Sequence, residues 1–374
     1  MLIGIDGNEA NVENKVGVSE FAFELLNRFS QIERENSKIQ VYLKDKPNSD
    51  LPHESNTWQY RVFRPRKLWT QWRLPLELYL ARPRPSVFFS PSHYSPRFSP
   101  IPTVVSVMDL SYLHFPELFN KSDLYQLINW TKYSVKKAKA VITISNSSRF
   151  DIIKAYDLPE AKVHVIYPGI KDIIDLEPHI YPMNELSTKY QITDEYILFV
   201  GTLQPRKNIK RLIEAFSKLI SEPKHKNIQL IIVGKKGWQY EDILAAPDEF
   251  NIPTQVKFLD YVHDEDLPQL YKNAICYVLP SLYEGFGLPI LEAMQYDCPV
   301  ITSNISSMPE AGGDAALYVN PTDTDDIMKK MKKLVESKEL RKELIKKGRA
   351  QVNKFSWEKA AKEVLTILTS VAKN

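Results

Sequence analysis

The sequence predicts an α/β protein with two domains, each built on a parallel sheet covered by helices. The chain has 374 residues, which is too long for one ordinary core at roughly 150 residues per domain. Short apolar runs suited to strands buried on both faces, such as 196–200 and 229–233, each end at a glycine. Helical patterns alternate with these runs, and that alternation is typical of parallel sheets.

The second half of the chain shows the alternation most clearly. After Pro205, apolar residues at helical spacing predict an amphipathic helix, and Pro289 marks the start of another. The further strands expected here are 256–259, 275–279, 299–302 and 317–319. Ligands of such sheets bind beyond the carboxyl ends of the strands. We therefore expect the chemistry in the loops that follow Val200, Val233, Leu279 and Ile301.

The first half shows the same pattern less sharply. Helices are expected at 19–29, 122–136 and 146–155. The strands expected are 2–5, 39–43, 87–89, 103–107, 140–144 and 163–167. We predict an N-terminal domain over 1–175, a second domain over 176–355, and an amphipathic C-terminal helix over 356–374 that packs back on the first domain.

Composition excludes several classes of protein. The net charge is only +3, which gives no case for nucleic acid as a partner. Cys276 and Cys298 lie in apolar stretches without a CxxC spacing, so buried reduced thiols are expected rather than a disulfide or a zinc site. The N-terminus begins as a strand and not as a signal peptide, and no run has the ~18 apolar residues of a membrane span. We expect a soluble, cytoplasmic protein that is compatible with contact at a membrane surface.

The segment 201–208 joins a buried strand to the amphipathic helix and carries Arg206 and Lys207. A helix N-terminus has unpaired N–H groups and a partial positive charge, so two cations there oppose the dipole. An anion between them would correct this, and a diphosphate fits because arginine can bind two of its oxygens. The alternative is a solvated basic turn. The segment is neither a Walker A loop nor a GxGxxG fingerprint.

The segment 281–292 gives the strongest signal. Glycines on both sides of Phe286 let the backbone approach a ligand closely, and Glu284 precedes them. Glu292 is expected in the first turn of the next helix. One carboxylate could accept hydrogen bonds from sugar hydroxyls and the other from a ribose. The alternative for Glu292 alone is compensation of the helix dipole.

These motifs resemble those of the large retaining GT-B glycosyltransferase family often called family 4. The segment 281–292 looks like its E-x7-E motif, and the likeness extends through 201–209, 234–238, 261–267 and 310–313. The resemblance implies two Rossmann-like domains facing each other across a cleft. It also implies that Arg206 and Lys207 bind the donor diphosphate, that Glu284 contacts the donor sugar and that Glu292 binds the ribose.

The resemblance implies further donor contacts. The backbone near Tyr261 and Val262 would meet the base, and Gly287 and Leu288 would lie close to the phosphates. The full set expected to bind the donor is Gly17, Gly201, Thr202, Arg206, Lys207, Gly234, Tyr261, Val262, Gly285, Phe286, Gly287, Leu288 and Glu292. Glu284 and Asp109 are the residues expected to be catalytic.

The first half resembles the family less tightly. Gly17 lies in a segment like the glycine-containing loop after the family's first strand, and Asn146 replaces the usual acid of a Thr-Ile-Ser-Glu segment. Asp109 belongs to a segment like His-Asp-Leu, but Met108 stands where histidine is usual. The sequence offers no register that brings another histidine to that place. For His93 and His114 we expect packing or surface roles.

The resemblance implies transfer of a hexose, with retention, from a nucleotide diphosphate sugar to a glycan or lipid-linked saccharide in surface polysaccharide synthesis. The segment 234–238 is similar to mannosyltransferase-like members, so GDP-mannose is the first donor to consider, with UDP-linked sugars next. No cofactor or metal is expected. The alternatives are another GT-B enzyme, such as an epimerase or a sugar-phosphate synthase, and a pseudoenzyme that binds the donor without transfer.

The segment 64–84 combines basic residues with Trp69 and Trp72. It is compatible with an anionic lipid-linked acceptor or a membrane surface. The alternative is a variable surface loop with some aromatic residues facing the core.

Overall fold

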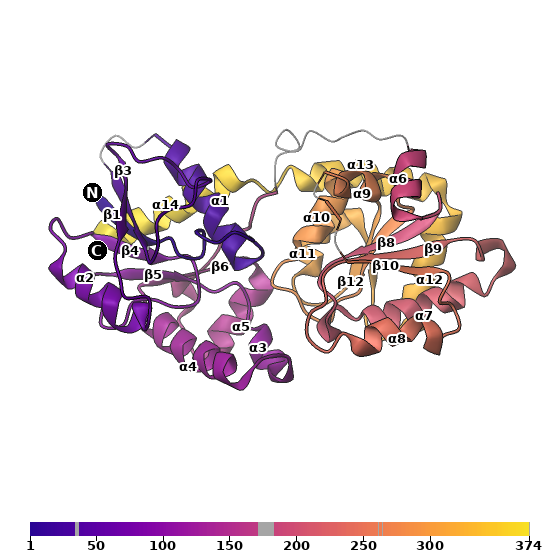
Figure 1. Ribbon diagram of the computed structural model, residues 1–374, viewed down its shortest axis with the longest axis horizontal. Coiled ribbons are helices and arrows are strands. Elements are labelled where there is room, and N and C mark those ends of the chain that lie inside the picture. The colour runs from indigo at the N-terminus through magenta and orange to yellow at the C-terminus, as the bar shows by residue number, and fades with distance from the viewer. Residues whose placement is uncertain (34–36, 171–182, 261, 264, 374) are drawn as a thin grey trace. The chain divides into compact units, whose positions relative to one another are not determined.

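The computed structural model describes residues 1–33, 37–170, 183–260, 262–263 and 265–373. The chain divides into two compact units, Met1–Gly169 with Ser356–Asn374, and Ile170–Phe355. The domain boundary expected at residue 175 lies outside the described residues. Each unit is an α/β layer structure on a parallel sheet (Figure 1).

Unit 1 contains a seven-stranded sheet with the strand order β3-β2-β1-β4-β5-β6-β7, and its strands pair in parallel. Its strands are β1 (Leu2–Asp6), β2 (Lys38–Leu43), β3 (Trp58–Val62), β4 (Val87–Ser90), β5 (Thr103–Ser106), β6 (Ala140–Thr143) and β7 (Val163–Val165). Its helices are α1 (Val18–Gln31), α2 (Leu74–Leu80), α3 (Ser111–His114), α4 (Lys121–Lys137), α5 (Asn146–Tyr156) and α14 (Trp357–Lys373). The residues of β4, β5 and β6 are all buried, which explains their unbroken small and apolar sequences.

The C-terminal helix α14 belongs to unit 1 and packs beside α1, although the two come from opposite ends of the chain (Figure 1). Trp357 begins the buried face of α14 and meets the edge of the Phe21 ring at a centroid distance of 5.8 Å. Gly169 lies so close that an added Cβ would be 2.1 Å from the Trp357 nitrogen. The first and last parts of the chain therefore share one core.

Unit 2 contains a six-stranded parallel sheet with the order β10-β9-β8-β11-β12-β13. Its strands are β8 (Tyr196–Val200), β9 (Gln229–Val233), β10 (Val256–Leu259), β11 (Cys276–Leu279), β12 (Val300–Ser303) and β13 (Ala316–Val319). Its helices are α6 (Met183–Tyr190), α7 (Ile209–Ile220), α8 (Glu241–Glu249), α9 (Leu267–Asn273), α10 (Leu288–Gln295), α11 (Met308–Gly312), α12 (Thr324–Glu336) and α13 (Lys338–Val352). The apolar stripe of α7 is buried, as its spacing predicts.

Some elements were not recognised in the sequence. The strand β3 alternates polar and apolar residues at the edge of its sheet and lacks an unbroken apolar run. The alternative of a variable surface loop near Trp69 is wrong in its conformation, because a π-helix, Trp69–Arg73, leads directly into α2, although an aromatic residue does face the core as that alternative expected. Trp69 is buried there, whereas Trp72 is exposed.

Two further observations concern the composition arguments. Cys276 and Cys298 are buried free thiols, and burial raises the pKa of Cys276 to about 12. Among the helices that the structure describes, none has the length and apolar character needed to cross a bilayer.

The contact between α14 and α1 leads to a stability prediction. We expect Trp357→Ala to lower the free energy of unfolding by about 3–5 kcal/mol, because a large side chain leaves a cavity under Phe21. Lys359→Ala is the matched control on the exposed face of the same helix, and it should change stability by less than about 0.5 kcal/mol. Urea unfolding followed by circular dichroism measures both. Equal losses would show that α14 contributes nothing specific to this core.

Candidate functional site

The site expected from the sequence falls at the carboxyl edge of the sheet in unit 2. The strand β8 is flanked by β9 on one side and β11 on the other, so the strand order reverses at this point. Ligands of open α/β sheets bind outside the carboxyl ends of the strands at such a switch point. The loop 201–208 follows β8 and the loop 280–287 follows β11, so the two strongest motifs meet there.

Glu284 joins these two loops by pairing with both cations. Its Oε2 atom lies 2.9 Å from Arg206 Nη1, and its Oε1 atom lies 2.6 Å from Lys207 Nζ. The three side chains are 8%, 19% and 9% exposed, in the order Glu284, Arg206 and Lys207. Buried charges of this kind persist only when they are paired and hydrogen-bonded.

The surrounding loop is built to hold Glu284 in place. Ser281 Oγ donates to Oε1 of Glu284 at 2.6 Å. The hydroxyls of Ser306 and Ser307 both donate to the Glu284 backbone carbonyl at 2.8 Å. Arg206 Nη1 also donates to the carbonyl of Tyr283 at 2.8 Å. Ser306 and Ser307 follow β12 and were missed in the sequence, because serines in a loop carry no pattern that assigns them a partner.

These contacts set the ionisation of Glu284. Burial alone would raise the pKa of its carboxyl group. The Lys207 ammonium and the Arg206 guanidinium outweigh that effect, with hydrogen bonds from Lys207 and Ser281, and lower the pKa from 4.5 to about 2. Glu284 is therefore a carboxylate at any pH near neutrality. It can accept hydrogen bonds and stabilise positive charge, but it cannot serve as a general acid.

The structure changes the electrostatic argument made from the sequence. Pro205–Lys207 is a 3-10 turn, Asn208 adopts a left-handed conformation with φ 60°, and α7 begins only at Ile209. The anion beside both cations is Glu284 of the same chain. One carboxylate against two cations leaves this cluster with a formal charge of +1. An anionic ligand that reached this cluster would meet that positive charge.

The two glycines at the ends of β8 and β9 allow the following loops to pair. An added Cβ on Gly234 would lie 2.0 Å from the Gly201 carbonyl oxygen, and the φ of Gly234 is 154°. Leu203 forms a parallel bridge with Lys236, which draws the loops together. Thr202 is exposed between them. Gly201 and Gly234 therefore have a structural reason to be glycine that is independent of any ligand.

The loop that follows Glu284 turns directly into α10. Gly287 has a φ of 101° at the N-cap of that helix, which favours glycine, and Leu288 is the first helical residue. Gly285 is buried. The Phe286 side chain is only 3% exposed and meets the Phe355 ring at 5.3 Å, so it is a core residue and only its backbone is placed for a ligand.

Glu292 does not lie in the first turn of its helix. It is the fifth residue of α10, and the first turn contains no acid, so the alternative of dipole compensation is wrong. The hydroxyl of Tyr271, on α9, donates to Oε2 of Glu292 at 3.3 Å. Tyr271 in turn stacks on Tyr296 with ring centroids 6.1 Å apart. Glu292 is half-buried and oriented by an aromatic neighbour.

Tyr277 is a residue of this site that the sequence analysis missed. It lies within the buried strand β11, and its hydroxyl donates to the Val200 carbonyl at 3.2 Å, at the end of β8. Burial raises its pKa well above the usual value, and the charges of Glu292 and Glu284 add to the effect. Both acids thus act on one phenol. A tyrosine inside an apolar run is interpreted from the sequence as a core residue, so its position at the site is visible only in the folded structure.

The residues expected to meet the base are only partly described. Val262 is 5% exposed. Tyr261 lies outside the described residues. Close by, Asp266 is 1% exposed and accepts hydrogen bonds from Lys189 Nζ at 2.6 Å and from the Tyr190 hydroxyl at 2.5 Å, which ties α6 to the start of α9.

In unit 1, Gly17 and Asp109 each lie at a carboxyl edge of the sheet. Gly17 has a φ of 56° at the N-cap of α1, and an added Cβ would meet nothing within 4 Å. The Asp109 carboxylate accepts a hydrogen bond from the Ser111 backbone at 2.8 Å. Met108 beside it is 6% exposed and belongs to the apolar core.

The ring of His93 is hydrogen-bonded to the Asp109 backbone, a partner that the expected packing role did not name. It comes from the loop after β4, the neighbour of β5, and its ring centroid lies 6.2 Å from that of Tyr112. Burial lowers its pKa despite the opposing charge of Asp109, so a neutral imidazole lies against Asp109. His114 is on the surface, 3.3 Å from Asp151, in keeping with its expected role.

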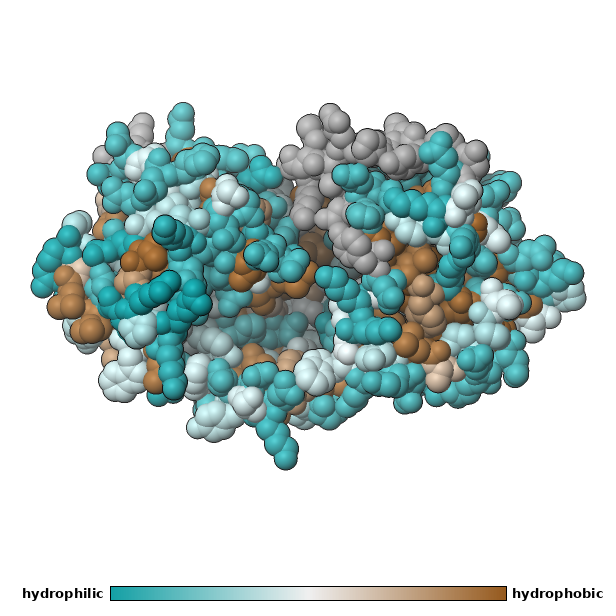
Figure 2. All heavy atoms as spheres, in the orientation of Figure 1, coloured by the Kyte–Doolittle hydropathy of each residue, from teal (hydrophilic) through white to brown (hydrophobic). Residues whose placement is uncertain are grey.

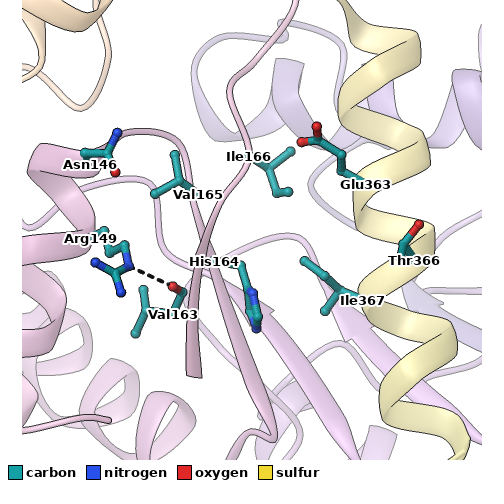
Figure 3. A pocket seen from close by; sticks show the side chains of 9 residues that line it. All are labelled: Asn146, Arg149, Val163, His164, Val165, Ile166, Glu363, Thr366 and Ile367. Atoms are coloured by element: carbon teal, nitrogen blue, oxygen red, sulfur yellow. Dashed lines mark hydrogen bonds between the residues drawn. The ribbon is translucent and has the colours of Figure 1, made fainter. Parts of the chain in front are cut away.

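Two other features of the described residues lie apart from these loops. Glu222, His225 and Glu336 could together hold a metal ion, but Lys332 and Lys224 already pair with the two carboxylates. A groove in unit 1 runs between α5, β7 and α14 (Figure 3). There Arg149 Nε donates to the Val163 carbonyl at 3.0 Å while Glu363, Thr366 and Ile367 line the opposite wall. Neither feature includes a residue expected to bind the donor.

Known structures define the class of protein to which the fold belongs. HepE of Anabaena, in complex with UDP and glucose, aligns with a TM-score of 0.73 at 17% identity and covers 99% of both chains. A sucrose-phosphate synthase of Thermosynechococcus elongatus aligns with a TM-score of 0.72 at 18% identity, over 99% of this chain and 98% of that one. Two parallel Rossmann-like sheets that match these neighbours define the GT-B class, and the expected fold class is confirmed.

The family follows from sequence. The model of glycosyl transferases group 1 matches residues 184–351, and that of glycosyltransferase family 4 matches 17–172. O-antigen chain mannosyltransferase B of Escherichia coli is 34% identical over 265 residues, which is 70% of this chain and 68% of the relative. The serotype-specific mannosyltransferase WbdA of Escherichia coli is 34% identical over 230 residues, 60% of this chain but 28% of WbdA. The chain belongs to the group 1, family 4 glycosyltransferases.

The lowered pKa of Glu284 leads to a prediction with a defined sign. A carboxyl group whose folded pKa is below its unfolded value stabilises the fold above the unfolded pKa, and that contribution is lost as the pH falls through the folded pKa. We expect Glu284→Gln to lower the free energy of unfolding by roughly 3 kcal/mol at neutral pH. The difference in this free energy between the variant and wild type should shrink as the pH falls from 4.5 to about 2.

Urea unfolding at a series of pH values measures this difference. Glu343→Gln is the control, because Glu343 is 56% exposed and pairs with Lys347 on the surface of α13. Glu343→Gln should lower the free energy of unfolding by less than about 1 kcal/mol. A Glu284→Gln variant as stable as wild type at neutral pH would mean that the buried pairs contribute no net stability.

Proposed function

We propose that this glycosyltransferase moves a hexose from a nucleotide diphosphate sugar to a glycan or lipid-linked saccharide during surface polysaccharide synthesis. Mannose from GDP-mannose is the first candidate, and a UDP-linked sugar is the second. Relatives named as mannosyltransferases, two of them of the O-antigen chain, support this choice of sugar and pathway. The observation that carries the proposal is the buried cluster of Glu284, Arg206 and Lys207 at the switch point of unit 2.

The donor diphosphate would bind against the surplus positive charge of this cluster. Arg206 and Lys207 are 19% and 9% exposed, so a phosphate that reaches them leaves water and meets them in a medium of low dielectric. As the bond to the sugar breaks, negative charge accumulates on the departing diphosphate. Fixed cations at that position stabilise the charge without reorganising, which is the main contribution expected from the protein.

Glu284 and Glu292 would hold the two sugars of the donor. Glu284 stays ionised, so it would accept hydrogen bonds from hydroxyls of the transferred hexose and stabilise positive charge at its reacting carbon. Glu292 would accept hydrogen bonds from the ribose, with Tyr271 fixing its carboxylate. A transfer with retention then needs no strong nucleophile from the protein, because the leaving diphosphate can guide the incoming hydroxyl on its own face.

Asp109 and Gly17 would contribute from unit 1. Asp109 is the second residue proposed to be catalytic, and the neutral His93 imidazole beside it would position it. Gly17 offers its backbone to the diphosphate, because no side chain shields it. The pseudoenzyme alternative rests on Met108, which is buried in the core where the resemblance leads one to expect a histidine. Donor binding without transfer or slow donor hydrolysis would favour that alternative.

We also propose that the protein acts in the cytoplasm, peripheral to the membrane, and that it needs no cofactor. Nucleotide sugars are made there, and a lipid-linked acceptor would present its saccharide at the membrane surface. The charge that a divalent cation supplies in other enzymes of phosphate chemistry would come from Arg206 and Lys207.

Calorimetric titration with GDP, UDP, ADP and their sugar conjugates tests the donor site. We expect one preferred nucleotide, and about ten-fold or greater loss of its affinity in Arg206→Ala, because the charge-assisted contact proposed between Arg206 and phosphate would be removed. Glu292→Ala should weaken nucleotide binding by a similar factor, whereas Glu284→Ala should mainly lower turnover.

Lys210→Ala is the control for charge, because Lys210 is a neighbouring cation that pairs with the exposed Glu249. Its nucleotide affinity should equal that of wild type. Thermal melts confirm that each variant is folded before titration. Unchanged affinity in both Arg206→Ala and Glu292→Ala would rule out this assignment of the donor site.

Chelation tests the proposed independence from metals. We expect the transfer rate to persist in excess EDTA, because the two cations paired with Glu284 would face the diphosphate. The measurement is the initial rate with EDTA, without it, and after Mg²⁺ is restored. Activity that disappears with EDTA and returns with Mg²⁺ would contradict the proposal.

A further inference from the structure

The helix formed by Trp69–Arg73 and α2 buries only one of its two apolar faces. On the inner face, Trp69 stacks on Phe63 with ring centroids 4.1 Å apart. Leu74 and Leu78 continue this face and are fully buried, in a cluster with Tyr42 and Phe88. This packing fixes the helix on unit 1 and determines which of its residues point outwards.

The outer face of the same helix is apolar as well. Its exposed residues are all large and apolar or aromatic: Leu68 (50%), Trp72 (68%), Leu76 (53%), Tyr79 (49%) and Leu80 (65%). We call these five residues the outer stripe. Leu68, Trp72, Leu76 and Leu80 follow one another at intervals of four, as on one side of a helix. Figure 2 shows hydrophobic surface over α2 at the left edge of the view. A contiguous apolar surface of this kind marks an interaction site.

Positive charge surrounds the outer stripe. Residues 61–84 carry seven Lys and Arg side chains and one carboxylate, a net charge of +6, whereas the whole chain carries only +3. The single carboxylate, Glu77, is already paired with Arg61 at 2.8 Å and with Arg73 at 3.2 Å. Arg64, Arg66 and Lys67 precede the stripe and are exposed. Of these three, Arg66 pairs with Asp45, and Arg64 and Lys67 place exposed positive charge beside the first residue of the stripe.

The cations beyond the stripe are held at the end of α2. The Arg82 guanidinium donates to the Ala81 carbonyl at 2.7 Å, and that of Arg84 donates to the Tyr79 carbonyl at 2.8 Å. Both side chains are thus fixed beside Tyr79 and Leu80 instead of extending freely into solvent. The helix has cations at both ends and apolar residues between them.

From this arrangement we propose that the outer stripe is a docking surface for an anionic lipid bilayer. Leu, Trp and Tyr side chains on one helix face, flanked by Arg and Lys, fit a helix that lies in the plane of the interface. The rings of Trp72 and Tyr79 suit the level of the headgroups, and the cations match anionic lipids. A second copy of the chain fits less well, because it would bring two segments of charge +6 together.

The docking surface rests on the peripheral membrane position proposed above and assigns residues to it, and it can be tested without donor or acceptor. If the proposed lipid-linked acceptor is correct, the surface also places unit 1 where that acceptor lies. Binding to vesicles needs neither nucleotide sugar nor acceptor. A failure of vesicle binding and a failure of donor binding are therefore separate results.

The test is flotation of the full chain with vesicles of phosphatidylcholine alone and of phosphatidylcholine mixed with phosphatidylglycerol. We expect binding to the anionic vesicles, weaker binding to the neutral ones, and loss of binding as salt is raised. The double variant Trp72→Ala, Leu76→Ala should bind roughly ten-fold or more weakly, because two exposed apolar side chains no longer enter the interface. Arg64→Glu with Lys67→Glu should weaken binding mainly at low salt.

The matched control is Tyr125→Ala with Phe150→Ala. These two aromatic residues are each 64% exposed on other helices of unit 1, and their removal should leave vesicle binding within roughly two-fold of wild type. Nucleotide affinity should be the same in every variant. The proposal is overturned if wild type does not bind anionic vesicles, or if the Trp72→Ala, Leu76→Ala variant binds as well as the control. A dimer that these two substitutions convert to monomer, without vesicle binding, would make a second copy the occupant and would also overturn it.

Discussion

The carboxylate of Glu284, held between Arg206 and Lys207, is the interaction on which the organisation of unit 2 depends. Burying three charged groups costs several kcal/mol for each one unless every charge finds a partner. The Ser281 hydroxyl donates to the Glu284 carboxylate, and the hydroxyls of Ser306 and Ser307 donate to its backbone carbonyl, so three loops are tied to one residue. A ligand that binds this cluster binds a rigid site, because folding has already removed water from the three charged side chains and fixed their positions.

The topology of the sheet explains why these loops can meet. Strands β8 and β11 are neighbours in space although more than seventy residues separate them in sequence, since the chain turns back to the centre after β10. Glycines at the ends of β8 and β9 let the backbones touch, and Tyr277 spans from β11 to the Val200 carbonyl. The two acids of the motif, both later in the sequence than Tyr277, then act on one buried phenol. Because β8 and β11 are neighbours in a parallel sheet, residues far apart in the sequence lie close enough for their charges to interact.

Most of the fold could be predicted from the sequence, because strands buried on both faces leave unbroken apolar runs and the glycines mark their ends. The edge strand β3 and the helix α8, which contains Pro247, lack such signals. The motifs containing Arg206 and Glu284 were found, but their direct pairing was not, since no local pattern encodes a contact across two strands. The same limit applies to His93, whose contact with Asp109 depends on the pairing of β4 with β5.

The local distribution of charge along the chain is informative in addition to the net charge of the whole chain. The net charge of +3 argues against nucleic acid, yet residues 61–84 carry +6 and the rest of the chain is acidic by three charges. What separates a lipid surface from a nucleic acid here is the apolar content between the cations. Nucleic acid is bound mainly through cations on phosphates, with stacking aromatics, whereas Leu68, Leu76 and Leu80 have no partner in such a complex. A bilayer offers both an anionic surface and hydrocarbon below it. Positive charge is thus arranged differently in the two units: it is buried and sparse beside Glu284 in unit 2, and exposed and mixed with apolar side chains at the outer stripe of unit 1.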